Sequence, residues 1–510
     1  MTARNTAGAE RVENGVPATA VSVPEGAEHE AAAEARPSTP SRAFRAATIA
    51  TIVLGSAASI LPSTAVNVAV PDFERVFQSP LTDVQWVVTA YLLGLSAVIP
   101  ISGWLADRFG TRRVYLGSLL TFSAASLLCG LAWSIHSEIA FRVLQGIAGG
   151  VIQPVGMAFL TRNTPPHRRG RMMATLGVPL LLAPALGPTI GGWLVQNSDW
   201  RVVFWVNIPA ALLSALVGYF VLRGRDVHVA HRLDAVGVVL ATPAVTMIIF
   251  GMTQGPARGW GSPVVLAPTL AGAVLVAAFI AWELRQREPL LQLRVFKDRG
   301  FTAAIIAMGS VAMALFGAVF LVPVFMQQVQ GFSTVDTGLL LGAQGITAAA
   351  LMPISGTLTD RIGPRPVVLS GIVMLAASTA WMTTVSSSTS KLSWIGMLAL
   401  RGAGMGFAMM PAFAAAYVTI APQTISRATA LANTLQRVFS SFGIAMLATI
   451  IAWRVTLHLP ARPTPLSARA AAAQSFDETL WVAFAFVLLS VPAAFFLQRA
   501  RRVEQDLPGA

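Results

Sequence analysis

The sequence predicts an all-α polytopic membrane protein with fourteen membrane-spanning helices. Of its 510 residues, 55% are hydrophobic and only 12% are charged, whereas soluble domains carry about 25% charged residues. A spanning helix takes ~20 apolar residues that satisfy their own backbone hydrogen bonds, and apolar runs of that length follow one another along the chain. A short charged turn also occurs twice, at 103–110 and 356–363, 253 residues apart. The repeated turn indicates two similar halves.

The elements follow from the alternation of apolar runs and polar loops. Residues 1–44 are rich in Ala, Glu, Pro, Ser and Thr and have no apolar core, so we expect a disordered cytoplasmic tail there. The spans are expected near 46–69, 84–105, 114–133, 139–161, 173–195, 202–222, 234–253, 263–283, 301–327, 335–357, 366–384, 393–418, 428–451 and 478–498.

Basic residues predict the orientation of these spans. With the N-terminus inside, twenty-one Lys and Arg residues fall in inner loops and seven in outer loops, and loops rich in Lys and Arg stay in the cytoplasm. We therefore expect both termini in the cytoplasm and the protein in the cell membrane. The repeat distance fits six-helix bundles at 45–225 and 291–500, two extra helices at 226–290 and a cytoplasmic tail at 501–510.

The charge pattern does not predict a nucleic-acid partner, although the formal net charge is +13. Basic residues mark every second loop and do not interleave with aromatic residues on one surface. All six histidines lie in the tail or in loops, and no acid lies at mid-depth of a span, so we expect no catalytic group and no metal site. The lipid bilayer is the partner that this composition indicates.

The repeated turn carries an aspartate in each copy, Asp107 and Asp360. An anion beside a helix N-terminus is favoured by ~0.3–1 kcal/mol, and arginines of the turn can pair with carboxylates or helix C-termini across the gap between helices. We therefore predict a latch that closes the cytoplasmic side in one state. Arg113 is expected only to set topology. The predicted latch residues are Gly103, Asp107, Arg108, Gly110 and Arg112, with Gly356, Asp360, Arg361, Gly363 and Arg365 in the second copy.

Several motifs resemble those of the major facilitator superfamily. The turn at 103–113 resembles its loop-2/3 signature, residues 142–146 (RVLQG) its fourth-helix motif, and residues 187–192 (GPTIGG) the fifth-helix motif associated with antiporters. Residues 63–71 (STAVNVAVP), 85–92 (QWVVTAYL) and 200–209 (WRVVFWVNIP) are similar to the fourteen-span drug:proton antiporter branch. The resemblance implies the major facilitator fold, with two six-helix bundles plus two extra central helices, and a transporter instead of an enzyme. It also implies a small-molecule substrate and protons as partners, and no cofactor beyond the proton gradient.

The fifth expected span is dense in glycine and proline. Glycines let helices approach closely, and prolines kink a helix. We interpret this span as a bendable helix that seals the outer side, although ordinary small-residue packing would look the same. The residues concerned are Gly177, Pro184, Gly187, Pro188, Gly191 and Gly192.

Three arginines lie inside spans, where a charge costs ~2.5–3.5 kcal/mol. Arg142 matches a family position linked to proton coupling or cavity gating and is also available to pair with a negative substrate group. Arg401, in a glycine-rich stretch, is considered as its counterpart in the second half. For Arg401 and Arg437 a structural role, capping broken backbone carbonyls, is an equal alternative.

The most informative departure from the family pattern is Pro62, which stands where the first helix usually carries an aspartate. If transport is coupled to protons, Glu138 and Asp336 are the candidates, unless both are solvated acids at helix starts. The missing acid favours a neutral, zwitterionic or anionic substrate.

Taken with the resemblance, these features predict a secondary exporter of amphipathic small molecules such as drugs or antibiotics. The alternative is an exporter of an endogenous lipid or a self-made natural product. Methionine and phenylalanine give an adaptable apolar surface, although such residues more often simply pack. The residues expected along the substrate path are Asn67, Gln145, Gln153, Gln328, Gln344, Met405, Met409, Phe413 and Asn433.

Overall fold

The computed structural model describes residues 42–222, 233–386, 388–418, 420–460 and 464–497. Within α8 (Arg169–Asn197) the side chains of residues 178–186, 188 and 189 lie outside this description. Residues 46–510 form one compact unit, which holds all the features described below apart from the first residues of α2. The tails predicted at 1–44 and 501–510 fall almost entirely outside the described residues.

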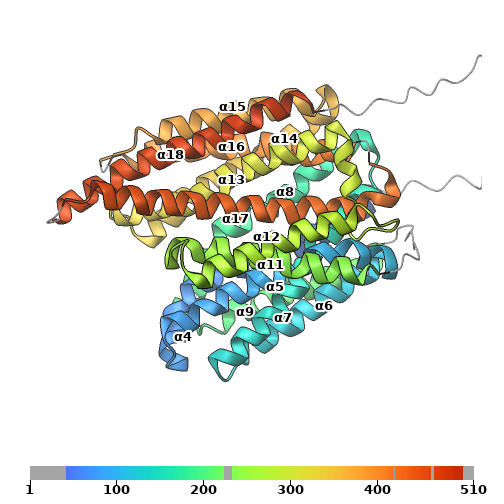
Figure 1. Ribbon diagram of the computed structural model, residues 1–510, viewed down its shortest axis with the longest axis horizontal. Coiled ribbons are helices and arrows are strands. Elements are labelled where there is room, and N and C mark those ends of the chain that lie inside the picture. The colour runs from blue at the N-terminus through green and yellow to red at the C-terminus, as the bar shows by residue number, and fades with distance from the viewer. Residues whose placement is uncertain (1–41, 223–232, 387, 419, 461–463, 498–510) are drawn as a thin grey trace, which may run out of the picture. The chain divides into compact units, whose positions relative to one another are not determined.

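The first half of this unit is built from helices joined by short turns (Figure 1). The region of the first span is divided into four pieces, and the sixth into two. The elements are α2 (Arg42–Ile60), α3 (Pro62–Ala65), η1 (Val66–Ala69), α4 (Val70–Phe77), α5 (Leu81–Phe109), α6 (Thr111–Gly130), α7 (Ile135–Arg162), η2 (Pro166–Arg168), α8, α9 (Val202–Trp205) and α10 (Asn207–Val221).

The remaining elements are an intervening helix pair and a second set of long helices. Throughout the described residues there is no strand, as the composition predicts. The elements are α11 (Ala235–Arg258), α12 (Pro263–Glu283), η3 (Leu293–Lys297), α13 (Arg299–Gln328), α14 (Thr334–Ile362), α15 (Pro364–Met382), α16 (Lys391–Ala416), η4 (Pro422–Thr424), α17 (Ile425–His458) and α18 (Pro465–Phe495).

Thirteen stretches of the described residues are long and apolar enough to cross a membrane. They coincide with thirteen of the fourteen expected spans, and α8, at 29 residues, occupies the place of the fifth. The prediction of an all-α membrane protein is therefore confirmed.

The last two helices are longer than expected. α17 continues to His458 and α18 starts at Pro465, so residues assigned to an outer loop are helical. The cause is a set of local contacts. Thr464 caps α18 in a reciprocal pair with Ser467, and Glu478 pairs with Arg454 and His458 at 3.3 Å each.

The first span is interrupted where the sequence places Pro62. Proline has no backbone N–H and fits the first turn of a helix better than its interior, and a new short helix begins at Pro62. A turn of 3-10 helix follows at Val66–Ala69 before α4 resumes. The short α and 3-10 segments that follow Pro62, α3 and η1, pack against α8.

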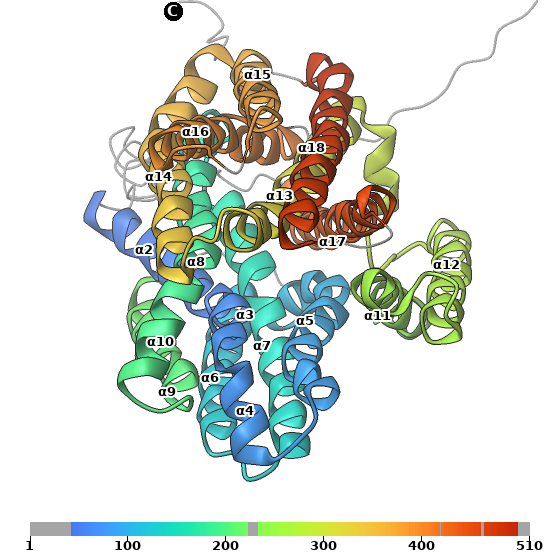
Figure 2. The ribbon, with the colours of Figure 1, turned by 90° about the vertical axis from the view of Figure 1, so that its left-hand side faces the viewer.

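The two sets of helices meet along several helix pairs. In the first set α7 packs between α5 and α6, and in the second α16 packs against α14 and α15 while α13 packs against α17 and α18. Contacts between the sets run from α8 to α14 and α16, and from α17 to α5 and α7. The α11–α12 pair lies beside α5 and α17 (Figure 2), so it contacts one helix of each set.

Candidate functional site

Asp107, at the end of α5, is enclosed between the two sets of helices with 1% of its surface exposed. Its Oδ1 accepts a hydrogen bond from Nη2 of Arg162 at 2.6 Å, at the end of α7. Its Oδ2 lies 3.5 Å from Nε of Arg427, in the first turn of α17. A buried carboxylate between two buried arginines thus joins helices from both halves. We name this end of the molecule, where α5 and α7 end and α17 begins, the Asp107 side.

The backbone at the Asp107 side comes into close contact. A Cβ placed on Gly103 would lie 2.9 Å from the backbone oxygen of Ser426 and 3.1 Å from Cα of Arg427. Only glycine therefore permits this approach of α5 to α17. The approach is what brings Asp107 within reach of Arg427.

The second copy of the turn repeats this arrangement on α8. Asp360 accepts hydrogen bonds from the backbone N–H of Gly170, at 3.0 Å to Oδ1, and of Arg171, at 3.1 Å to Oδ2. A Cβ on Gly356 would lie 2.8 Å from the Gly170 oxygen. These free N–H groups and the helix dipole favour an anion at this position. The two aspartates, 253 residues apart, thus hold the first turns of α17 and α8.

The arginines of the repeated turns take other positions. Arg112 donates to the backbone oxygen of Tyr219 near the end of α10 and lies over the Tyr219 ring. Arg365 lies over the Phe495 ring at 5.0 Å, while Arg108 and Arg361 are exposed. The described contacts of Arg112 and Arg365 stay within their own halves. Arg162 and Arg427, which were not singled out from sequence, hold Asp107 instead. Gly110 and Gly363 have φ of 88° and 94°, where glycine is favoured.

Arg142 is fully buried inside the first half. Its Nε donates to the backbone oxygen of Val87 at 3.0 Å and its Nη1 to Oε1 of Gln145 at 2.6 Å. The guanidinium also lies 4.3 Å from the centre of the Tyr91 ring, a favourable cation–π contact. Arg142 is therefore enclosed and held by the protein's own groups in this state, although its Nη2 has no hydrogen-bond partner within the described residues, and its pairing with a substrate anion stays a prediction.

Glu138 lies one helical turn before Arg142 and is also fully buried. Both of its carboxylate oxygens lack a hydrogen-bond partner within the described residues. The alternative of a solvated acid at a helix start therefore does not describe Glu138. It does describe Asp336, which is 39% exposed at the side chain and pairs with Nζ of Lys391 at 2.8 Å.

Arg401 is the structural counterpart of Gln145, not of Arg142. Gln145 donates from Nε2 to Oγ of Ser126 at 2.7 Å, and Arg401 donates from Nη1 to Oγ1 of Thr379 at 3.4 Å, the same position one repeat later. Glycine contacts establish the helix register. Gly146 packs on the Tyr91 backbone and Gly402 on the Gln344 backbone, also one repeat apart. Arg401 Nη2 donates to the Ala314 oxygen at 3.0 Å, so this arginine holds α13 and α15 to α16.

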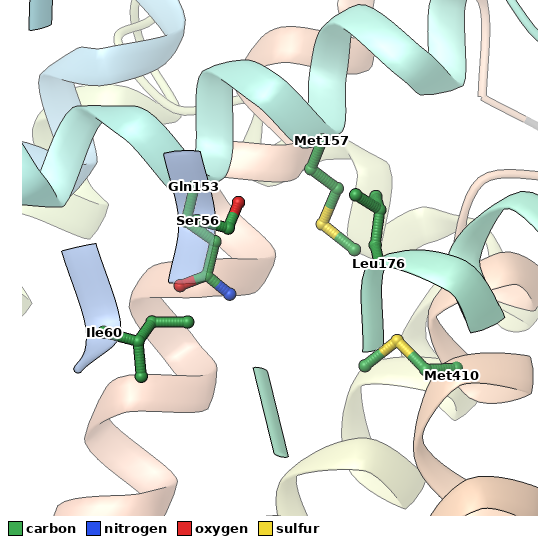
Figure 3. A pocket seen from close by; sticks show the side chains of 6 residues that line it. All are labelled: Ser56, Ile60, Gln153, Met157, Leu176 and Met410. Atoms are coloured by element: carbon green, nitrogen blue, oxygen red, sulfur yellow. The ribbon is translucent and has the colours of Figure 1, made fainter. Parts of the chain in front are cut away.

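A cavity lies between the two halves (Figure 3). Most of its wall comes from the first half and one side chain from α16. Among its described lining residues there are one hydroxyl and one amide, the rest being apolar or thioether groups, and none is charged. Its lining residues are Ser56, Ile60, Gln153, Met157, Leu176 and Met410.

The predicted path residues divide into three groups. Gln153 lines the cavity, and the Nδ2 atom of Asn433 lies 3.9 Å from the Met157 sulfur at its wall. Asn67 and Gln328 are exposed. The others are packed away from the cavity: Gln145 beside Arg142, Gln344 against the Met405 sulfur, and Met409 and Phe413 in the core.

Three glycines of α8, which occupies the place of the fifth expected span, allow neighbouring helices to approach closely. Gly187 and Gly191 face the broken first span, and a Cβ on Gly191 would lie 2.6 Å from the Ala65 oxygen. Gly177 faces the second half, where a Cβ would lie 2.5 Å from Cγ of Met410. Gly192 is looser, with Val68 Cγ1 at 3.7 Å from such a Cβ. The side chains of Pro184 and Pro188 lie outside the described residues.

Residues 52–444 match the family model of the Major Facilitator Superfamily. The chain belongs to this superfamily. Over 410 residues it is 39% identical to the multidrug resistance protein B homolog of Mycobacterium tuberculosis. The aligned region covers 79% of this chain and 75% of that protein. It is 29% identical over 417 residues to the multidrug export protein EmrB of Escherichia coli, with 80% and 81% covered.

Among solved structures, the superfamily's proton:xylose symporter XylE superposes with a TM-score of 0.58, covering 88% of this chain and 96% of that one at 15% identity. That likeness shows the fold alone. As a superfamily member, the protein is a multi-pass membrane transporter, and its two sets of helices are the two bundles of the major facilitator fold. The family resemblance read from the motifs is thereby confirmed.

Proposed function

We propose that this protein is a secondary exporter of amphipathic small molecules that works by alternating access and is driven by the proton gradient. The observation that carries the proposal is the closure of one side by two repeat-related contacts, Asp107 with Arg427 and Asp360 with the first turn of α8. Between them and the other side lies a cavity walled by both halves. Breaking both contacts would open that cavity to the Asp107 side.

The proposed orientation places the Asp107 side in the cytoplasm and the protein in the cell membrane. The threefold excess of Lys and Arg in the loops of that side supports it. The structure then represents a state with its cytoplasmic side closed. The boundaries proposed for the two bundles, near residues 225 and 290, follow from the repeat.

Glu138 is proposed to carry the coupled proton. Burying an ionised carboxylate without a hydrogen-bond partner is so costly that the group takes up a proton instead, and neither oxygen of Glu138 accepts a hydrogen bond within the described residues. Glu138 and Arg142 interact electrostatically. When Glu138 loses its proton, the new carboxylate would attract Arg142 away from Val87 and Gln145. Proton release would thereby change how α7 is held against α5.

The uncharged cavity wall supports substrates that bind mainly through apolar contacts, because Met157, Leu176 and Met410 offer flexible or branched apolar surface. Relatives named for multidrug resistance and multidrug export support the same class. The second candidate, an endogenous lipid or natural product, is favoured by the absence of an acid from that wall, since such cargo need not be cationic.

The experiment is transport by the purified full-length protein in liposomes, with an imposed pH gradient and a panel of cationic, neutral and anionic aromatic compounds. The proposal predicts movement of at least one compound against its concentration gradient, and loss of that movement when the pH gradient is collapsed. Movement that never exceeds equilibration would overturn it.

A further inference from the structure

Arg437 lies at mid-depth of the membrane on α17. It is ten residues past Arg427, which marks the Asp107 side, and ten residues of helix rise about 15 Å. The hydrocarbon core of a bilayer is about 30 Å thick. The guanidinium of Arg437 is therefore carried close to the middle of the membrane.

Arg437 differs from the other two arginines of the spans in the kind of contact it makes. Arg142 and Arg401 are fully enclosed and donate to carbonyl oxygens and polar side chains. Arg437 makes no hydrogen bond or ion pair with the part of the chain that the structure describes, and it is partly exposed. A cation at this depth costs ~2.5–3.5 kcal/mol unless it faces water or a partner. The structural alternative, a cap on backbone carbonyls, has no contact to support it.

The face of α17 that carries Arg437 is directed at the first half, beside the cavity. Asn433, one turn earlier on the same face, reaches the Met157 sulfur of the cavity wall. The Tyr91 hydroxyl of α5 is close enough to Arg437 for an electrostatic interaction. Arg437 thus stands between the halves, one turn from the cavity wall on the side away from Asp107.

We propose that Arg437 is the anion-binding residue of the transport site, and that the preferred substrates are amphipathic organic acids. This inference rests on the proposed function and narrows its substrate class. The carboxylate or sulfonate of the substrate pairs with the Arg437 guanidinium, which offers five N–H donors in a planar fork. The apolar body occupies the cavity against Met157, Leu176 and Met410.

The charges around the cavity agree with this choice. The described lining residues include no acid that would pair with a cationic drug. The buried acid of the first half, Glu138, is enclosed and not accessible to a substrate in this state. A cation entering the cavity would meet an unpartnered arginine and no carboxylate, so cations are disfavoured.

The test uses two probes with the same aromatic body, 1-naphthaleneacetate and its neutral amide, 1-naphthaleneacetamide. Binding to the purified full-length protein is measured by isothermal titration calorimetry for the wild type, Arg437→Gln, Arg437→Lys and Arg454→Gln. Arg454 lies on the same helix near its far end and pairs with Glu478, so Arg454→Gln controls for loss of one positive charge. Movement of both probes is followed in liposomes under a pH gradient.

We expect the wild type, Arg437→Lys and Arg454→Gln to bind the acid at least about tenfold more tightly than the amide, a difference of ~1.4 kcal/mol. Arg437→Gln should bind both probes equally, with its affinity for the amide unchanged, which also shows that the variant is folded. Equal binding, or no binding, of both probes by the wild type would overturn the inference. So would an Arg437→Gln variant that keeps its preference for the acid or loses both probes alike. Tight, Arg437-dependent binding of the acid with no gradient-driven movement of either probe would contradict the proposed function and would still support Arg437 as an anion-binding residue.

Discussion

Asp107 and Arg427 form an ion pair between helices of opposite halves, with 3.5 Å between Oδ2 and Nε. The contact of Asp360 in the second copy is of a different kind, because the hydrogen bonds described for Asp360 come from backbone N–H groups of α8. One contact thus depends on two charges and the other on one charge and a helix terminus. The aspartates of the two turns thus accept from two different kinds of donor, an arginine side chain for Asp107 and backbone N–H groups for Asp360.

Removal of the Asp107 charge should open the Asp107 side. Asp107→Asn leaves two buried arginines without their carboxylate, and breaking a buried pair in this way costs about 3–5 kcal/mol. The closed state loses that stabilisation. In a Cys129→Ser background, a cysteine replacing the buried Thr429 of α17 should be alkylated at least tenfold faster when Asp107→Asn is added.

The control for this experiment is Arg113→Gln, because Arg113 is exposed and is expected only to set topology. It should leave the alkylation rate unchanged. An Asp107→Asn variant that alkylates at the control rate would show that the ion pair does not hold this side closed.

Close packing of α8 on the broken first span should not tolerate a methyl group at Gly191. The added Cβ would lie 2.6 Å from the backbone oxygen of Ala65, which cannot rotate away, and overpacking of this kind costs about 1–3 kcal/mol. Gly191→Ala should lower the melting temperature of the purified protein by several degrees and reduce transport. Gly192→Ala is the matched control, since its Cβ would lie 3.7 Å from Val68 Cγ1. Equal melting temperatures for the two variants would contradict the packing account.

If Glu138 carries the coupled proton, its loss should affect transport driven by a pH gradient but not substrate counterflow, which needs no gradient. Glu138→Gln keeps the shape of the side chain and removes its titration, so movement driven by a pH gradient should fall at least tenfold while substrate counterflow persists. Asp336→Asn changes an exposed acid in a surface ion pair. It should leave both kinds of transport unchanged, because such pairs contribute little to the stability of the folded protein. Liposome assays with and without the gradient measure both. Undiminished pH-driven transport by Glu138→Gln would assign the proton to another group.

Much of the fold could be predicted from the sequence because membranes restrict backbone structure so strongly. Apolar runs identified the spans, and the spacing between Asp107 and Asp360 identified the two halves. The ends of α17 and α18 were misjudged because polar and basic residues there looked like a loop. Contacts with Glu478 and the cap at Thr464 make them helical, and such contacts are invisible before the two helices are paired.

The site was less predictable, since burial and partners depend on which helices meet. Glu138 looked like a solvated acid by its position near a helix start, and only the packing around α7 shows that it is enclosed. Arg401 was compared with Arg142 because both are arginines followed by glycines. The equivalent contacts of Gly146 and Gly402 show that Arg401 occupies the position in the second half that Gln145 occupies in the first. The sequence offered a usable signal for Arg427: a basic residue starting a span in the half opposite Asp107.

Alternating access by opening of the Asp107 side is the central claim, and a distance across that side tests it most directly. Arg113 and Pro366 are exposed, one repeat apart, at the starts of α6 and α15. Spin labels on cysteines at these two positions, in a Cys129→Ser background in liposomes, report their separation by double electron–electron resonance. We predict one distance at rest, and a second, longer distance under conditions that support transport, with a larger share in Asp107→Asn. A single unchanged distance while transport proceeds would contradict the claim.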